Sequence, residues 1–205
     1  MDEIEATPDH CAFCFDVLTR ELETRAYGEP RTRIQVPEFP DVQCPLFVTW
    51  YKYEGAGSNL RGCIGTFSDV PVHQGLADYA KTSAFDDRRF SPIDISELSK
   101  LECGVSLLVK FEEAANVRDW EIGRHGILIK WTDEHSGQKY HATYLPEVAS
   151  DQQWNHDETL RSLVKKAGFR LGSRDPLPSG IRLTRYQSSK QKMSFADYRS
   201  FRSAK

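Results

Sequence analysis

The amino-acid sequence predicts an α+β protein, in which helices and antiparallel hairpins interleave without the regular strand–helix–strand order of a parallel sheet. Apolar residues occupy every second position from Leu101 to Phe111, which is the period of a long strand with one buried face. Turn residues at 55–59 and 132–137 each separate two β-branched and aromatic runs, a pattern typical of hairpins. Four further segments carry apolar residues at helical spacing, so helices and strands share the chain.

The first helix along the chain is clearly marked. Thr7 is a suitable N-cap, Pro8 fits the first helical position, and apolar residues recur from Cys11 to Leu22. Gly28, which precedes a proline by two residues, ends the run. From residue 31 to 44 the sequence has prolines and no clear period, so we expect a loop along the surface.

The remaining elements follow in order, each predicted from its own pattern. Strands are expected at 46–51, 60–67, 101–111, 127–131, 140–144 and 181–183, where β-branched, aromatic or alternating apolar residues gather. Helices are expected at 72–80, at 160–167 before Gly168, and at 195–201 after the N-cap Ser194. The segment 83–90 is expected to be a charged loop.

Composition argues against several classes of protein. No apolar run approaches the roughly 20 residues that span a bilayer, so we expect no membrane association. The acidic N-terminal residues lack the apolar region of a secretory signal. The five scattered cysteines, an odd number, suit reduced thiols in the cytoplasm, the nucleus or both better than a disulfide framework.

Charge is distributed unevenly along the chain. Residues 1–158 carry 15 basic and 28 acidic side chains, whereas residues 159–205 carry 12 basic and two acidic ones. Two interpretations stay open. Either the two parts neutralise each other in the folded protein, or residues 182–205 form a face that binds a polyanion such as RNA weakly.

The segment from Asn59 to Phe67 reads NLRGCIGTF and places an arginine and a cysteine among two glycines. Glycine inside a strand lowers stability by roughly 0.5–1 kcal/mol relative to alanine. The presence of Gly62 and Gly65 inside a strand therefore calls for a structural explanation, such as a bulge, a bend or the close approach of another group. Cys63 between them is either a small core residue or an accessible thiol.

Chemistry at Cys63 would require a cation that lowers its pKa and a base. On a regular strand Arg61 points to the same side as Cys63, so its guanidinium is the candidate cation. The candidate bases are His125, whose two flanking glycines are expected to leave its ring accessible, and His141, which lies on a strand. Alternatively, His125 only caps its own turn, and His141 faces solvent or a cleft.

No metal or cofactor site is predicted. Cys11 and Cys14 have the Cys-x-x-Cys spacing of redox and zinc motifs, but they lie within an amphipathic helix and no second such pair exists. Core packing is therefore the better interpretation. The sequence also lacks the phosphate-binding glycine loops and the His-Glu-x-x-His motif. Asp86 to Arg89 is expected to be a cluster of charges that pair locally and stay solvated.

Several segments together resemble the AMMECR domain family. The segment Leu60–Phe67 matches the hallmark of that family. Further matches are AFDDRRF at 84–90, GRHGI at 123–127, ATYLPEV at 142–148, KAGF at 166–169 and TRYQS at 184–188. The similarity runs from about Pro8 to Tyr198, which is nearly the whole chain.

The resemblance implies a curved, mainly antiparallel sheet built from hairpins, with helices packed outside and two unequal lobes. It implies a single domain at 8–200, with a short N-terminal tail at 1–7 and a C-terminal tail at 201–205. It implies no reaction, because none is established for the family. Because Memo-like and radical-SAM proteins are often encoded nearby in prokaryotes, a Memo-like protein is one expected partner.

Two functions stay open. The first, which we expect, is a binding or adaptor protein that holds a protein or a small-molecule ligand in a groove around Leu60–Gly65. The residues assigned to this binding are Arg61, Gly62, Gly65, Arg89 and Tyr144. The second is an enzyme in which Cys63 is the nucleophile or carries the substrate, assisted by Arg61 and by His125 or His141.

Overall fold

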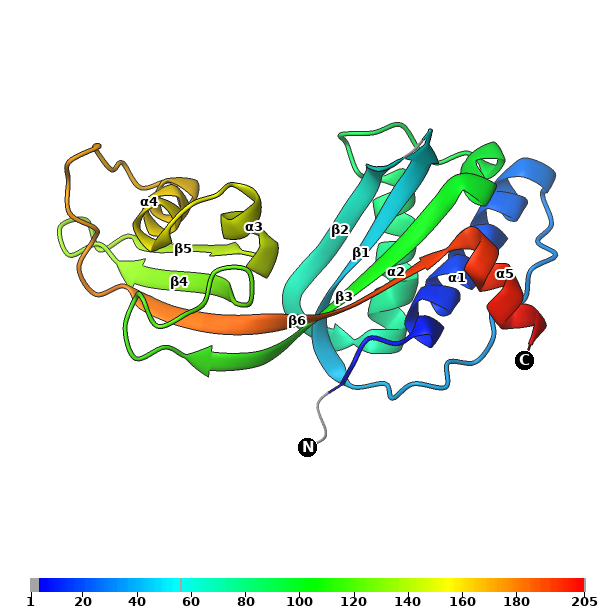
Figure 1. Cartoon of the computed structure of the whole chain (residues 1–205), viewed down its shortest axis with the longest axis horizontal. Helices are drawn as coiled ribbons and strands as arrows, with labels where there is room; N and C mark the ends of the chain where they lie inside the picture. The colour runs from blue at the N-terminus through cyan, green and yellow to red at the C-terminus, as the bar shows by residue number, and fades with distance from the viewer. Residues whose placement is uncertain (1–3, 56, 205) are drawn as a thin grey trace. The chain divides into compact units, whose positions relative to one another are not determined.

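The computed structural model of the chain describes residues 4–55 and 57–204, and its helices and antiparallel strands alternate in mixed order (Figure 1). The predicted α+β class is therefore confirmed. The chain divides into two compact units of unequal size, residues 1–108 with 189–205 (unit 1) and residues 109–188 (unit 2). The assignment of 8–200 as a single domain, with tails at 1–7 and 201–205, stays a prediction.

Unit 1 contains most of the helices. Its elements are α1 (Pro8–Tyr27), β1 (Gln43–Glu54), β2 (Gly57–Pro71), α2 (Val72–Phe85), the 3₁₀ helix η1 (Ile95–Lys100) and α5 (Phe195–Ser203). Strand β3 (Leu101–Glu113) begins in this unit, and strand β6 (Arg182–Ser194) ends in it. The first predicted hairpin is confirmed as β1 and β2, which pair antiparallel.

Helices α1 and α2 cover one face of this hairpin. As predicted, α1 begins at Pro8 after the N-cap Thr7 and ends at Gly28, whose φ is 81°. The ring of Phe15 on α1 packs edge-on against Trp50 of β1, with centroids 5.1 Å apart. The indole Nε1 of the same Trp50 donates to a carbonyl oxygen of α2 at 3.0 Å. Trp50 thus marks the covered face, and the residues before and after it face the other way.

Unit 2 has its own core. Its elements are β4 (Gly126–Thr132), β5 (Lys139–Tyr144), α3 (Pro146–Asp151) and α4 (His156–Lys166), with the remaining parts of β3 and β6. β4 pairs antiparallel with both β5 and β6. Ile129 and Trp131 of β4 pack in a core with Leu160 and Leu163 of α4. The strand order in the whole sheet is β2-β1-β3-β6-β4-β5, so β2 is an edge strand.

Four elements differ clearly from the sequence expectation. The structure adds η1 and α3, α2 continues to Phe85 into the segment expected to be a charged loop, and β6 continues to Ser194 instead of ending near residue 183. Both added helices have only six residues, too few to show an apolar period. Most residues of β6 after Tyr186 are polar, and pairing with neighbouring strands decides their conformation more than local preference does.

Basic residues near the C-terminus pair with acidic residues from earlier in the sequence. The ion pairs are Arg185 with Glu112 and Asp119, Lys192 with Glu102, and Arg202 with Asp16. Each pair lies within one unit. These contacts favour internal neutralisation over an exposed polyanion-binding face at 182–205, and polyanion binding there stays a prediction.

Candidate functional site

The two glycines of the motif strand β2 are explained by close packing. Neither has a positive φ, so their backbone conformation is open to other residues. A Cβ on Gly62 would overlap the carbonyl oxygen of Ser83 at the end of α2. A Cβ on Gly65 would overlap the carbonyl oxygen of Leu46 and the ring of Phe47, the residue of β1 that pairs with Gly65. Close approach, one of the reasons considered from the sequence, therefore holds at both positions.

The backbone of Cys63 is held by the loop that follows α2. Its N–H donates to Oδ2 of Asp87 at 2.9 Å, and its carbonyl oxygen accepts from Nη2 of Arg89 at 3.3 Å. Arg89 also donates to both carboxylate oxygens of Asp87, at 2.9 and 2.7 Å. Together these two side chains form hydrogen bonds with the outward N–H and C=O groups of Cys63, where a neighbouring strand would otherwise pair.

Asp87 differs from the sequence expectation, because its side chain is only 5% exposed rather than solvated. The hydrogen bonds from Arg89 dominate its electrostatics and hold the pKa of Asp87 well below its usual range. The pKa of Arg89 is raised, mainly by the hydrogen bonds to Asp87, with a smaller contribution from the charge of Cys63. Arg89 is thus a cation in electrostatic contact with the motif cysteine.

The side chain of Cys63 lies on the sheet face opposite to the helices. Thr49, its partner on β1, donates from Oγ1 to the Cys63 sulfur at 3.1 Å. The thiol is partly exposed, whereas the other four cysteines are buried. Apolar and aromatic neighbours surround it on this face. We call the set the open-face patch: Phe47, Tyr51, Leu60, Cys63 and Phe67.

Arg61 does not lie on a regular strand, as the sequence argument assumed. Trp50 pairs with Gly62 and Tyr51 pairs with Leu60, so Arg61 is the extra residue of a β-bulge. Its guanidinium makes a bidentate contact with Glu97, at 3.0 and 2.9 Å.

The remaining contacts of Arg61 are also structural. Nη1 donates to the carbonyl of Ser91 at 2.7 Å, and Nη2 donates to the carbonyl of Pro92 at 3.2 Å. Lys52 joins the same carboxylate at 2.9 Å. Burial alone would raise the pKa of Glu97, but the hydrogen bonds from Arg61, the Asp94 backbone and Lys52 lower it to about 2. Arg61 therefore anchors β2 to the segment that leads into η1.

A cavity of about 590 Å³ adjoins the start of the motif. Lys52 and Glu54 of β1 and the segment 59–61 of β2 line one part, and residues between Phe90 and Glu97 line the rest. The cavity meets the motif at Leu60 and Arg61, whereas Gly62, Cys63 and Gly65 do not line it.

The candidate bases lie in unit 2, whereas Cys63 lies in unit 1. The prediction of an accessible ring at His125 is wrong, because its side chain is buried and Nδ1 accepts from the Glu121 N–H at 2.9 Å. Burial, followed by the charges of Arg124 and Arg185, lowers the pKa of His125. His125 therefore caps its own turn, the alternative interpretation.

His141 and Tyr144 lie on β5 and face opposite sides of the sheet. His141 is exposed and lines a cavity of about 850 Å³. Tyr144 packs against the core of unit 2, and its hydroxyl is 2.9 Å from Oγ of Ser162. Nζ of Lys166 lies over the Tyr144 ring, 4.5 Å from the centroid.

Of the predicted site residues, the structure groups Arg61, Gly62, Cys63, Gly65 and Arg89 on or beside β2.

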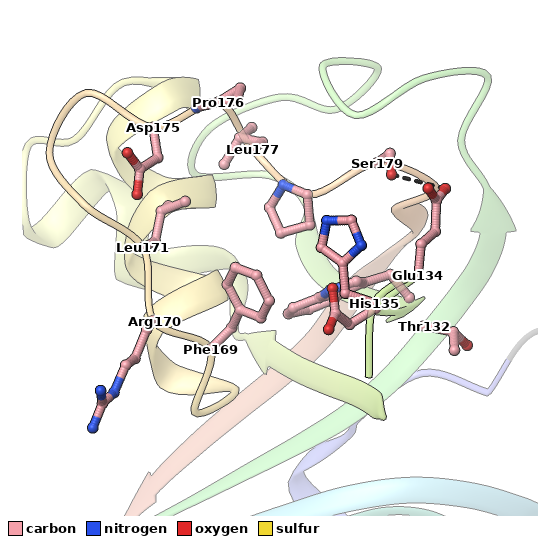
Figure 2. Close-up of a pocket in the computed structure, with 13 residues that line it drawn as sticks. Thr132, Glu134, His135, Phe169, Arg170, Leu171, Asp175, Pro176, Leu177 and Ser179 are labelled. Carbon is pink, nitrogen blue, oxygen red and sulfur yellow. Dashed lines mark hydrogen bonds between the residues drawn. The ribbon is translucent and has the colours of Figure 1, made fainter. Parts of the chain in front are cut away.

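A second cavity of unit 2, about 410 Å³, lies between the β4–β5 turn and the loop after α4 (Figure 2). Figure 2 shows His135 and Glu134 on one side of it and Phe169 and Leu171 on the other. Glu134 already accepts from Oγ of Ser179 at 3.0 Å. The acidic side chains that line this cavity stabilise the surrounding loops, and we assign the cavity no function.

Sequence reasoning missed three contributors to the site. The sequence indicated only that Phe47 lies on a strand, because the pairing of β1 with β2 is what places its ring over Gly65. Asp87 was noted as part of a charged cluster, and the sequence did not show that it is buried. Glu97 had a detectable signal, since Asp94 and Glu97 have the spacing of a capping box, and the structure contains that box at the start of η1.

The comparisons with known proteins decide the family. The family model described as AMMECR1 matches residues 11–191, most of the chain. The chain belongs to the AMMECR1 family. An uncharacterised protein of Arabidopsis thaliana is 41% identical over 199 residues, which cover 97% of this chain and 90% of that protein. An uncharacterised protein of Schizosaccharomyces pombe is 40% identical over 190 residues, which cover 93% and 94% of the two chains.

A solved structure supports the fold of this AMMECR1-family protein. The crystal structure of an uncharacterised protein from Pyrococcus horikoshii is similar, with a TM-score of 0.66, 22% identity, and coverage of 92% of this chain and 94% of that chain. At this identity the similarity shows the fold alone. Within the part of the chain that the structure describes, no helix has the length and apolar character needed to cross a membrane.

Replacing Gly62 by alanine is expected to lower the free energy of unfolding by about 1–3 kcal/mol, because the added Cβ overlaps the Ser83 carbonyl and overpacks the β2–α2 contact. Gly57→Ala on the same strand is the matched control, since a Cβ there meets nothing within 4 Å. Urea unfolding of both variants measures the difference. A Gly62→Ala curve that superposes on wild type would show that this close approach is unnecessary.

Glu97 is expected to make stability depend on pH. Because folding lowers its pKa from 4.5 to about 2, its contribution is complete above about pH 4.5 and is lost as the pH falls through about 2. Near neutral pH, Glu97→Gln should lower the free energy of unfolding by about 1.5–3 kcal/mol, the range for hydrogen bonds to charged groups. Urea unfolding at several pH values should show this deficit shrinking in acid.

The control for Glu97→Gln is Glu29→Gln, which changes an exposed glutamate between α1 and β1. That variant should follow wild type at every pH. A deficit of Glu97→Gln that stays constant from neutral pH into acid would contradict the assignment of the lowered pKa to Glu97.

Proposed function

We propose that this AMMECR1-family protein is a non-catalytic binding protein, an adaptor that uses the open-face patch and the adjoining cavity at Leu60 and Arg61. The observation that carries the proposal is the apolar character of the patch. The uncovered face of an antiparallel sheet is usually polar. Here Leu60 and Phe67 are 39% and 40% exposed and lie on the same face as Cys63. Apolar surface of this kind is typical of interaction sites.

The electrostatics around the motif favour binding over catalysis. The guanidinium of Arg61 is engaged by Glu97 and two backbone carbonyls. Arg89 donates to Asp87 and to the Cys63 carbonyl. Both cations therefore hold the strand in place, which is what a rigid, preorganised binding surface requires.

The partner that fits the patch is a protein that presents apolar or aromatic side chains. The edge of β2 at Cys63 is occupied by Asp87 and Arg89, so such a partner binds the face rather than adding a strand there. A Memo-like protein is the first named candidate, from the family resemblance, and a small-molecule ligand at the same loop is the alternative occupant. The proposed compartment is the cytoplasm, the nucleus or both.

The alternative function is an enzyme that uses Cys63 as nucleophile or substrate carrier. The observations in its favour are the partly exposed thiol, the hydrogen bond from Thr49 and the nearby charge of Arg89. In this hypothesis Arg89, which donates to the Cys63 carbonyl, replaces Arg61 as the candidate cation. The base predicted from the sequence was His125 or His141, and of these two His125 is buried within its turn.

The experiment that tests the proposal is quantitative capture of partners from cells by the tagged full chain. Binding of a purified Memo-like protein to the same tagged chain is measured in parallel. Phe67→Ser and Leu60→Ser are expected to lose the proteins that wild type retains, because each removes apolar area from the patch. Val36→Ser, which changes a side chain that is 87% exposed in the loop before β1, is the matched control and should retain them.

Cys63→Ser separates the two functions. A binding protein keeps its partners in this variant, whereas a substrate-carrying thiol loses a covalent adduct that intact-mass measurement detects on wild type. Identical capture by wild type, Phe67→Ser and Leu60→Ser would refute the open-face patch as the binding surface. An adduct at Cys63 that turns over would establish the enzyme instead.

A further inference from the structure

Unit 2 carries a row of basic side chains across its sheet. Strand β4 lies between β5 and β6 (Figure 1). Lys130 of β4 pairs directly opposite Arg182 of β6 and, on its other side, directly opposite His141 of β5. Ile129 and Trp131, the neighbours of Lys130 along the strand, belong to the core. Because side chains alternate along a strand, the row lies on the face opposite to the core, and its three members are exposed.

Without a bound anion, the row of basic side chains lowers the stability of the sheet. Like charges that lie directly opposite one another on adjacent strands destabilise a sheet. Among the residues that the structure describes, neither Lys130 nor Arg182 has an ion-pair partner, in contrast to Arg185 on the same strand β6, which binds Glu112 and Asp119. A bound anion over the row would remove the repulsion.

The row lines the cavity of about 850 Å³, which is within the range of roughly 300–1,000 Å³ common for small-molecule sites. A further cation, Lys139, and the hydroxyls of Thr132 and Thr184 line it as well. Glu113 is the one carboxylate among the described lining residues. The cavity therefore offers several positive charges and hydroxyl donors to a single ligand.

We propose that this cavity binds an organic phosphate, a small molecule whose phosphate oxygens pair with Lys130, Arg182 and Lys139. A small phosphate compound fits better than a nucleic acid because Lys130, Lys139 and Arg182 line a single cavity. The next basic residue along β6, Arg185, is already paired with Glu112 and Asp119. This site lies in unit 2 and does not depend on the function proposed for unit 1.

Pyrophosphate is the probe, because it carries two linked phosphate groups and no other binding feature. Titration calorimetry with the full chain is expected to show saturable binding, and Lys130→Gln is expected to weaken the affinity by at least about tenfold. Lys165→Gln removes an exposed lysine of α4 that does not line the cavity, and should leave the affinity unchanged.

Thermal unfolding gives a second readout that separates lost binding from lost folding. Without pyrophosphate, Lys130→Gln is expected to unfold at the same temperature as wild type or higher, because the substitution relieves the repulsion in the row. At one fixed concentration, pyrophosphate should raise the unfolding temperature of wild type and of Lys165→Gln by the same amount, and should raise that of Lys130→Gln by less.

Three outcomes overturn the proposal. The first is the absence of saturable binding up to about 10 mM pyrophosphate, a concentration that would detect even millimolar affinity. The second is equal affinity in Lys130→Gln and Lys165→Gln. The third is tight binding of a short single-stranded RNA by a protein that does not bind pyrophosphate, which would identify the row as part of a polyanion surface.

Discussion

The contact of Asp87 and Arg89 with the backbone of Cys63 is the interaction on which the motif strand depends. β2 is at the edge of the sheet, and an edge strand presents unpaired N–H and C=O groups to any chain that approaches. Here the carboxylate accepts the N–H and the guanidinium donates to the C=O. A carboxylate as buried as that of Asp87 is tolerated because Arg89 neutralises it through two hydrogen bonds.

This contact also determines which surface of the strand is accessible. At Gly62 the end of α2 approaches from the covered face, and β1 pairs along the inner edge. Asp87 and Arg89 occupy the outer edge at Cys63, so the open-face patch is the surface that remains for a partner. The ion pairs of Arg61 and Glu97 stabilise the same strand at its bulge. In unit 2, by contrast, Lys130 and Arg182 have no ion-pair partner among the residues that the structure describes.

The sequence predicts the hairpins and the main helices well, because their signals are local. Thr7, Pro8 and Gly28 mark α1, and the glycines of NLRGCIGTF indicate close packing before any contact is known. The bulge at Arg61 could not be predicted, since a bulge is a property of pairing between two strands. The burial of Asp87 and of His125 depends on which segments pack over them, and the local sequence does not show this.

The basic row shows the same limit more clearly. Lys130 and His141 lie on the two strands of a hairpin, whereas Arg182 follows only after α3 and α4, and the register of β6 against β4 brings it opposite Lys130. The sequence indicated an excess of basic residues near the C-terminus without showing which of them are paired. Tertiary pairing, rather than composition, thus separates a structural cation such as Arg185 from an available one such as Arg182.

Residue-resolved hydrogen exchange at the Cys63 amide tests the central claim most directly. Asp87→Ala removes the acceptor of this N–H, whereas Asp86→Ala removes an exposed neighbouring carboxylate and serves as the control. The account predicts much faster exchange at Cys63 in Asp87→Ala, with the Trp50 amide still protected and with Asp86→Ala unchanged throughout. Unchanged protection of the Cys63 amide in Asp87→Ala would contradict it.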